Sequence, residues 1–169
     1  MTAVVVDTNV ILAANGQHQD LSPNGVRQCS DRILSVIKGH RVCIDDGFEI
    51  IKEYGNKICS KKQPGIGYQF YKWVVQNRSN ENIISAVVLV RHQTRGYESF
   101  PDDPELANFD PPDRKFVAVA ALHASNPIIL QATDSKWLGW DGALKRHGVQ
   151  VEFVCPVDIE RFRQNKLGK

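Results

Sequence analysis

The sequence lacks long hydrophobic runs, a secretory leader and any paired cysteine motif. Its longest mostly apolar stretch, Ile83 to Val90, is far shorter than the roughly 20 residues of a membrane-spanning helix. No basic leader or cleavage site precedes the first apolar residues. The four cysteines show neither CxxC spacing nor a nearby histidine pattern, which argues against a zinc site and favours reduced, mostly buried thiols. These absences predict a cytoplasmic protein with no membrane partner.

The composition is that of an ordinary globular protein, with 42% hydrophobic and 24% charged residues. A chain of 169 residues can bury its own core, so we expect residues 1–169 to form a single domain. The formal net charge of +2 is too small to indicate a nucleic-acid partner by itself. If four carboxylates surround metal ions, the charge on the remaining residues rises to +6, which suits a polyanionic substrate better.

Apolar runs and helical patterns alternate along the chain. The expected strands are Val4–Asp7, Arg41–Ile44, Ile83–Val90, Ile128–Ala132 and Gln150–Val154. The expected helices are a short one after Asp7, then Val26–Lys38, Asp45–Cys59, Tyr68–Gln76, Asp113–Ala124, Ser135–Arg146 and a last one after Pro156. Residues 61–67 and 96–112 are expected to be a basic turn and a loop. This alternation predicts the α/β class, with a parallel sheet covered by helices on both faces.

Two of the apolar runs end at a carboxylate, Asp7 in the first and Asp134 in the fourth. In open α/β sheets, ligands collect at the carboxyl ends of the strands, so these acids are placed for chemistry. Small polar residues that could orient the two acids flank them, namely Thr8, Asn9, Thr133 and Ser135. Helix capping is the alternative role for each acid, because an aspartate before a helix satisfies free backbone N–H groups.

Two further acids are expected on partly buried helix faces. Asp113 shares the apolar face of its helix, where a carboxylate needs a partner, although capping is again the alternative. Glu53 lies at the border of the apolar face of its helix, whereas Glu49 points nearly opposite and suits a solvated surface position. A plain surface role is the alternative for Glu53. Asp110, three residues before Asp113, is an auxiliary candidate.

These acids are accompanied by no Cys–His or Ser–His–Asp arrangement. Several carboxylates in one cleft repel one another and have raised pKa values unless a cation is present. Hard divalent ions such as Mg²⁺ prefer oxygen ligands, and they activate water and stabilise the leaving oxygen in phosphodiester hydrolysis. The acids therefore predict a metal-dependent phosphoryl-transfer site.

Four segments, in this order, resemble the PIN-domain nucleases. Val4–Leu12 (VVVDTNVIL) is similar to the opening of that family, and Phe48–Tyr54 (FEIIKEY) to its helix with the second acid. Asp110–Phe116 (DPPDRKF) is similar to the Asp-Pro-x-Asp-x-x-Phe segment of one branch. Ala132–Trp137 (ATDSKW) is similar to the segment with the fourth acid. The resemblance spans most of the chain.

The resemblance implies an α/β/α sandwich around a mostly parallel sheet and Mg²⁺- or Mn²⁺-dependent cleavage of RNA. It assigns the catalytic metal ligands to Asp7, Glu53, Asp113 and Asp134. Many small members are toxins of toxin–antitoxin pairs, so an antitoxin is one candidate partner and a second copy of the chain, in a homodimer, is another. The chain is longer than the minimal members, and the elaboration is expected at about residues 60–112.

Two basic clusters are candidates for contacts with substrate phosphates. Lys57, Lys61 and Lys62 lie near the end of the helix that carries Glu53, and Arg91 and Arg95 follow the central apolar run. Solvated surface charge is the alternative for both clusters, and lysines at a helix C-terminus are also explained by the helix dipole.

Two other functions compete with the nuclease. A phosphatase with an aspartyl nucleophile also begins with an aspartate after an apolar strand, but Asn9 stands where its second aspartate is expected. A PIN fold kept only for binding RNA or protein is the other alternative. Missing acids would favour that alternative, and none of the four is missing.

Overall fold

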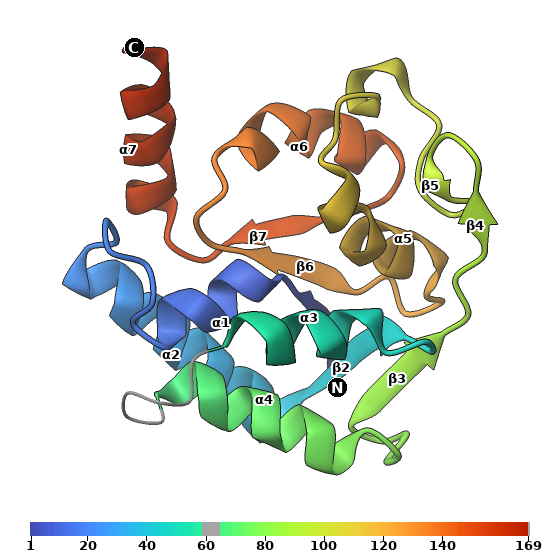
Figure 1. The fold of residues 1–169 in the computed structure, drawn as a ribbon, viewed down its shortest axis with the longest axis horizontal. Coiled ribbons are helices and arrows are strands. Elements are labelled where there is room, and N and C mark those ends of the chain that lie inside the picture. The colour runs from blue at the N-terminus through green and yellow to red at the C-terminus, as the bar shows by residue number, and fades with distance from the viewer. Residues whose placement is uncertain (59–64, 169) are drawn as a thin grey trace.

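The computed structural model describes residues 1–58 and 65–168, which form three layers (Figure 1). The middle layer is a five-stranded parallel sheet with the strand order β3-β2-β1-β6-β7. Its strands are β1 (Thr2–Val6), β2 (His40–Asp45), β3 (Ile84–Val87), β6 (Ile128–Gln131) and β7 (Val151–Phe153). The predicted α/β class and α/β/α sandwich are confirmed.

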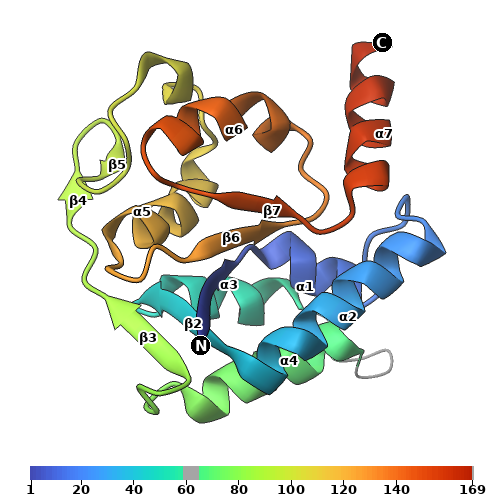
Figure 2. The same ribbon diagram turned by 180° about the vertical axis from the view of Figure 1, so that it is seen from behind.

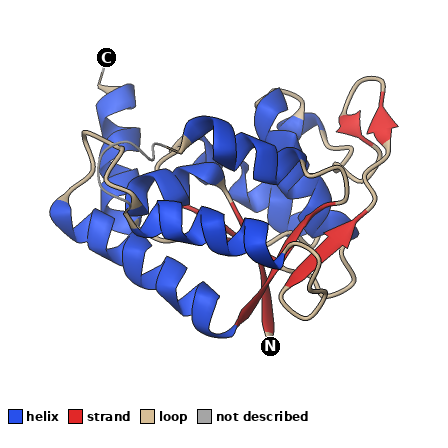
Figure 3. Ribbon diagram, turned by 60° about the horizontal axis from the view of Figure 1, so that its bottom comes forward, coloured by secondary structure: helices blue, strands red, loops and turns tan. Residues whose placement is uncertain are grey.

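Helices cover both faces of the sheet, as Figure 3 shows. Their bounds are α1 (Thr8–Ala14), α2 (Pro23–Gly39), α3 (Glu49–Lys57), α4 (Ile66–Asn77), α5 (Arg114–Leu122), α6 (Lys136–Arg146) and α7 (Pro156–Leu167). Helices α1 to α4 pack on one another at one face, and α5 packs on β1, β2 and β6 at the other (Figures 1 and 2). Right-handed crossovers between parallel strands produce this division.

Strand β1 is the centre of the core. Val4, Val5 and Val6 are fully buried, because β2 and β6 flank the strand and helices cover both of its faces. The strand order reverses direction at β1 and β6, since the chain builds outward from β1 to β3 and then returns to add β6 and β7. The carboxyl ends of β1 and β6 therefore form a topological switch point, where α/β sheets bind ligands.

Helix α3 begins later than the sequence predicts. Asp45 ends β2, and its side chain accepts hydrogen bonds from the backbone N–H groups of Glu49 (2.7 Å) and Ile50 (3.0 Å). Phe48 adopts a left-handed conformation with φ of 57°. The prediction that the helix starts at Asp45 was wrong, because Asp45 caps the helix across an intervening turn.

In the segment predicted as an elaboration at about 60–112, the described residues 65–112 belong partly to the three layers and partly to the surface. Helix α4 packs on α1 and α2, and β3 forms an edge of the sheet. The chain then leaves the sheet in an antiparallel ribbon of β4 (Arg91–His92) and β5 (Gly96–Tyr97), followed by 3₁₀ turns at Pro104–Leu106 and Pro111–Asp113. The predicted strand thus ends at Val87 instead of Val90. The ribbon and the turns, within and before the predicted loop, are too short to leave a periodic pattern.

Arg114 holds this surface segment against α5. The buried guanidinium donates hydrogen bonds to the carbonyls of Phe109 (3.1 Å from Nε) and Ala107 (3.0 Å), and it lies 4.8 Å from the centre of the Phe100 ring. The Phe109 ring packs against Trp137 and Trp140 at centroid distances of 4.9 and 4.4 Å. These contacts fix the chain immediately before Asp110.

The described part of the chain contains no helix both long and apolar enough to cross a membrane. Cys29, Cys43 and Cys155 are buried free thiols, as predicted. Cys59 lies outside the described residues.

Candidate metal centre

Three aspartates form a compact group beside the carboxyl end of β6. Asp110, Asp113 and Asp134 each offer a carboxylate oxygen, and these oxygens lie within 4.8 Å of one another. Asp110 precedes the 3₁₀ turn before α5 and Asp113 ends it, whereas Asp134 lies in the loop between β6 and α6. Asp110, predicted as an auxiliary, is therefore a full member of the group.

Asp7 approaches the same group from the end of β1. It is 4% exposed, and its carboxylate accepts hydrogen bonds from the Asn9 N–H (2.9 Å) and from Gln131 Nε2 (3.3 Å). Burial raises the pKa of Asp7 well above its ordinary value, and the negative charges of Asp113, Glu53 and Asp134 raise it further. The hydrogen bond from Asn9 opposes this rise. Asp7 is thus electrostatically linked to the other predicted acids.

Asp113 experiences the same repulsion. Burial and the charges of Asp134 and Glu53 raise the pKa of Asp113 from 3.8 to about 6, although Lys115 acts in the opposite direction. Asp113 precedes α5, but its side chain makes no capping hydrogen bond. Helix capping therefore does not account for this carboxylate.

Capping does describe part of the geometry of Asp7 and Asp134. Asp7 caps α1 through Asn9, and Asp134 accepts a hydrogen bond from the Lys136 N–H at the start of α6 (3.1 Å). A carboxylate has two oxygens, with about four acceptor sites between them. The capping bond leaves acceptor sites unused on each side chain, so capping and cation binding are compatible roles.

Glu53 lies outside the compact group of three aspartates. Its carboxylate is held between Lys57 and Lys115, with both N–O distances at 2.7 Å. Burial disfavours its ionised form, but hydrogen bonds from Lys115 and Lys57 outweigh this and lower the pKa of Glu53. The side chain of Glu53 is 11% exposed and that of Glu49 is 41% exposed, as the helical pattern predicts.

Gln131, which the sequence argument missed, connects the two strand ends. Its fully buried amide donates to Asp7 and accepts from the backbone N–H groups of Ala132 (2.9 Å) and Asp134 (3.3 Å) and from the side chain of Asn9. Asn9 in turn accepts from the Ala132 N–H (3.0 Å). The available signal was a polar residue within an apolar run, since a buried amide needs several partners.

The remaining polar candidates make fewer contacts. Thr8 and Ser135 are buried, and Thr133 is half-buried. Thr8 Oγ1 has no hydrogen-bond partner among the described residues, and the Ser135 side chain does not cap α6. The Asn9 side chain, by contrast, accepts a hydrogen bond from the backbone N–H of Ala132, close to Asp134.

The basic residues predicted to contact substrate phosphates lie in different surroundings. Lys57 and Arg91 line a groove beside Glu53 with a volume of about 410 Å³. Arg95 turns into the ribbon segment, where it donates to the carbonyls of Phe100 (3.0 Å) and Glu98 (3.1 Å). Lys61 and Lys62 lie outside the described residues.

Replacing Gln131 by leucine is expected to reduce the free energy of unfolding by about 1–3 kcal/mol, because the partly buried N–H of Asp134 loses its acceptor. It should also weaken Mn²⁺ binding, since Asp7 loses one of its positioning contacts. Urea unfolding and calorimetric Mn²⁺ titration measure the two effects. Gln164→Leu on the exposed face of α7 is the control. Equal effects of the two substitutions would contradict the role assigned to Gln131.

No protein-family model, curated protein or solved structure matches this chain. The chemistry of the site therefore has to be argued from its own geometry. That geometry is an all-oxygen group of three aspartates with Asp7 close enough to interact with it electrostatically, and the pKa values of Asp7 and Asp113 are raised.

Proposed function

We propose that this protein is a divalent-metal-dependent endoribonuclease. One observation carries the proposal: carboxylates from β1, from the turn before α5 and from the loop after β6 converge at the switch point of the sheet. Burial and their mutual repulsion raise the pKa values of Asp7 and Asp113, and a bound cation would relieve the repulsion. The resemblance of the four segments to PIN-domain nucleases supports RNA as the substrate.

The donor set suits Mg²⁺ or Mn²⁺. Carboxylate oxygens are the ligands that these hard ions prefer. The three aspartates offer oxygens that lie close enough together to bind one ion. Asp110, Asp113, Asp134 and Asp7 would hold the ion, directly or through water. Such an ion supplies Lewis-acid activation of the attacking water and stabilisation of the leaving oxygen.

The side chains around the acids orient the carboxylates and offset part of their negative charge. Asn9 and Gln131 hold the two oxygens of Asp7 in a defined orientation. The ammonium group of Lys136 pairs with Asp110 and offsets part of the negative charge. The resemblance assigns Glu53 to the metal ligands as well, and in this structure Glu53 also fixes Lys57 and Lys115 beside the acids. These lysines can attract the phosphate that the acids alone would repel.

The test is cleavage of structured and unstructured RNA with and without Mn²⁺, with wild type beside Asp134→Asn. We expect cleavage by wild type that requires the ion, and a large loss together with weaker Mn²⁺ binding in the variant. Asp141→Asn, which alters an acid on α6 outside the group, should behave like wild type. Cleavage that persists in a chelator, or undiminished cleavage by Asp134→Asn, would refute the proposal.

A role as the toxin of a toxin–antitoxin pair is a finer proposal that rests on the resemblance, and a cytoplasmic location is one that rests on the lack of paired cysteine motifs. A small co-transcribed neighbouring gene whose product suppresses the activity would support the toxin role. RNA binding without any cleavage would instead favour the alternative of a binding module.

A further inference from the structure

A groove of about 410 Å³ lies beside the acid group, between α3, the ribbon and the start of α5. Pro111 and Pro112, the two residues between Asp110 and Asp113, form part of its lining. The groove therefore adjoins the acids directly.

The lining is rich in positive charge. Lys52 and Lys57 come from α3, Arg91 from β4 and Lys115 from α5, and they face only Glu49 and Glu53 within the lining. The groove thus carries two more cations than anions, next to a cluster of aspartates. A polyanion that the acids repel is attracted a short distance away.

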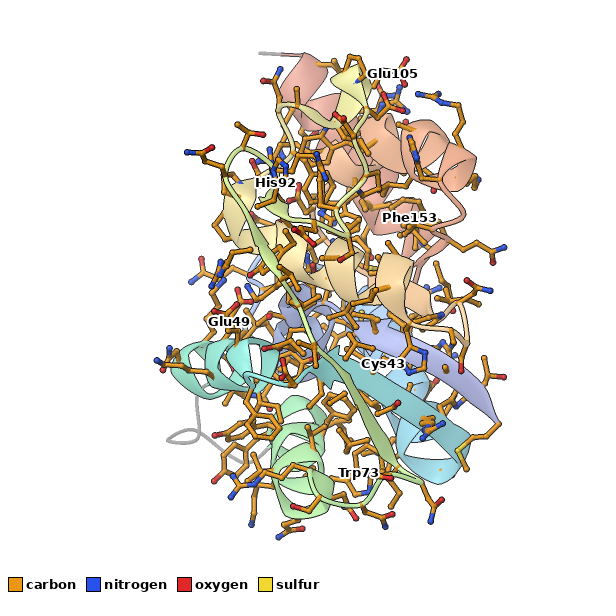
Figure 4. The ribbon with its side chains drawn as sticks, turned by 90° about the vertical axis from the view of Figure 1, so that its right-hand side faces the viewer. Cys43, Glu49, Trp73, His92, Glu105 and Phe153 are labelled. Carbon is orange, nitrogen blue, oxygen red and sulfur yellow. The ribbon has the colours of Figure 1, made fainter. Side chains whose placement is uncertain are left out.

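The ribbon is tied to α3 at Glu49, which Figure 4 shows below His92 of the ribbon. The Tyr97 hydroxyl donates to Glu49 Oε2 (2.8 Å), and Arg91 pairs with the other oxygen. The Arg91 guanidinium also lies 4.9 Å from the centre of the Tyr97 ring. These contacts make the ribbon a wall of the groove.

Two cations of the groove remain available to a ligand. The Arg91 and Lys57 side chains are 69% and 52% exposed, respectively, although each pairs with a glutamate. A guanidinium has five N–H donors and an ammonium has three, so each can bind a carboxylate and a phosphate together.

We infer that this groove is a phosphate-binding subsite for a single-stranded polynucleotide, separate from the acid group, and that the ribbon positions the strand. The volume lies within the roughly 300–1,000 Å³ range of pockets that hold one small ligand. This volume is about that of one nucleotide with its phosphate, so we expect a single strand to bind more tightly than a duplex. The cations of the lining would pair with phosphates, so we expect single-stranded RNA and DNA to bind alike. The inference rests on the proposed nuclease function for its place in the reaction.

The test is fluorescence anisotropy of a labelled polyuridine strand at several salt concentrations, in a chelator so that no cleavage occurs. Lys57→Gln and Arg91→Gln should each raise Kd about 3- to 10-fold and reduce the salt slope by about 0.7, the value for one phosphate contact on a single strand. Lys145→Gln is the matched control, because Lys145 also forms an i,i+4 pair (2.8 Å, with Asp141) and is 61% exposed. It should change neither quantity.

Three outcomes separate this inference from the nuclease proposal. Unchanged Kd and salt slope in both groove variants, or a duplex that binds as tightly as the single strand, would overturn the subsite. Variant-sensitive binding in a protein that never cuts RNA with Mn²⁺ would support the subsite and refute the nuclease. Metal-dependent cleavage with Kd and KM unaltered in the variants would support the nuclease and refute the subsite.

Discussion

Replacing Asp7 by asparagine is expected to reduce Mn²⁺-dependent RNA cleavage by at least about 10³-fold and to leave the fold intact. Asparagine keeps an oxygen that can accept the Asn9 N–H, so the cap of α1 survives. Asparagine cannot also accept the bond from Gln131 Nε2, but the substitution removes a buried charge whose pKa is already raised, which offsets that loss. We therefore expect the loss of cleavage to come from the missing metal ligand and not from unfolding. Single-turnover cleavage rates and circular dichroism measure activity and fold.

Asp45→Asn is the matched control for this prediction. Asp45 is also a buried aspartate at the end of a parallel strand, but it bonds to the first turn of α3 and not to the acid group. Asparagine is a comparably good capping residue, so cleavage should persist. Equal losses in the two variants would show that any buried acid at this edge matters only for folding. Full cleavage activity of the Asp7→Asn variant would refute a catalytic role for Asp7.

Asp113→Asn is expected to stabilise the metal-free protein at neutral pH while abolishing its stabilisation by Mn²⁺. The pKa of Asp113 is raised from 3.8 to about 6 in the folded state, so folding opposes its ionisation. The folded protein therefore binds this proton more tightly than the unfolded chain, and stability falls as pH rises from about 4 to about 6. Above that window the variant should be more stable by about 1–3 kcal/mol.

Urea unfolding in a chelator at about pH 4 and about pH 8, and again with Mn²⁺ at the higher pH, measures this effect. At the lower pH the carboxyl group is largely protonated, so wild type and Asp113→Asn should be nearly equal in stability. Asp31→Asn, at an exposed position of α2, is the control and should show no comparable gain. A variant that is less stable than wild type at the higher pH, or equally stabilised by Mn²⁺, would contradict the prediction.

The architecture could be read from local patterns. Buried parallel strands need continuous β-branched runs, and β1 and β6 each match one to within a residue or two. Helical periodicity placed Glu53 toward the interior and Glu49 toward solvent. These features depend on neighbours within a few residues, which the sequence specifies directly. The shift of α3 to Glu49 escaped the prediction because a side-chain cap reaches across a turn.

The sequence by itself determined the parallel sheet, the order of its main elements and the presence of acids at the ends of β1 and β6. Only the tertiary structure decided that Asp110 joins Asp113 and Asp134, and that Glu53 is held by Lys57 and Lys115. It alone placed Gln131 between the strand ends and the ribbon against α3. The reason is physical: strands follow from local burial patterns, whereas most of these contacts join segments far apart in the sequence, which meet only when the sheet and the helices pack together.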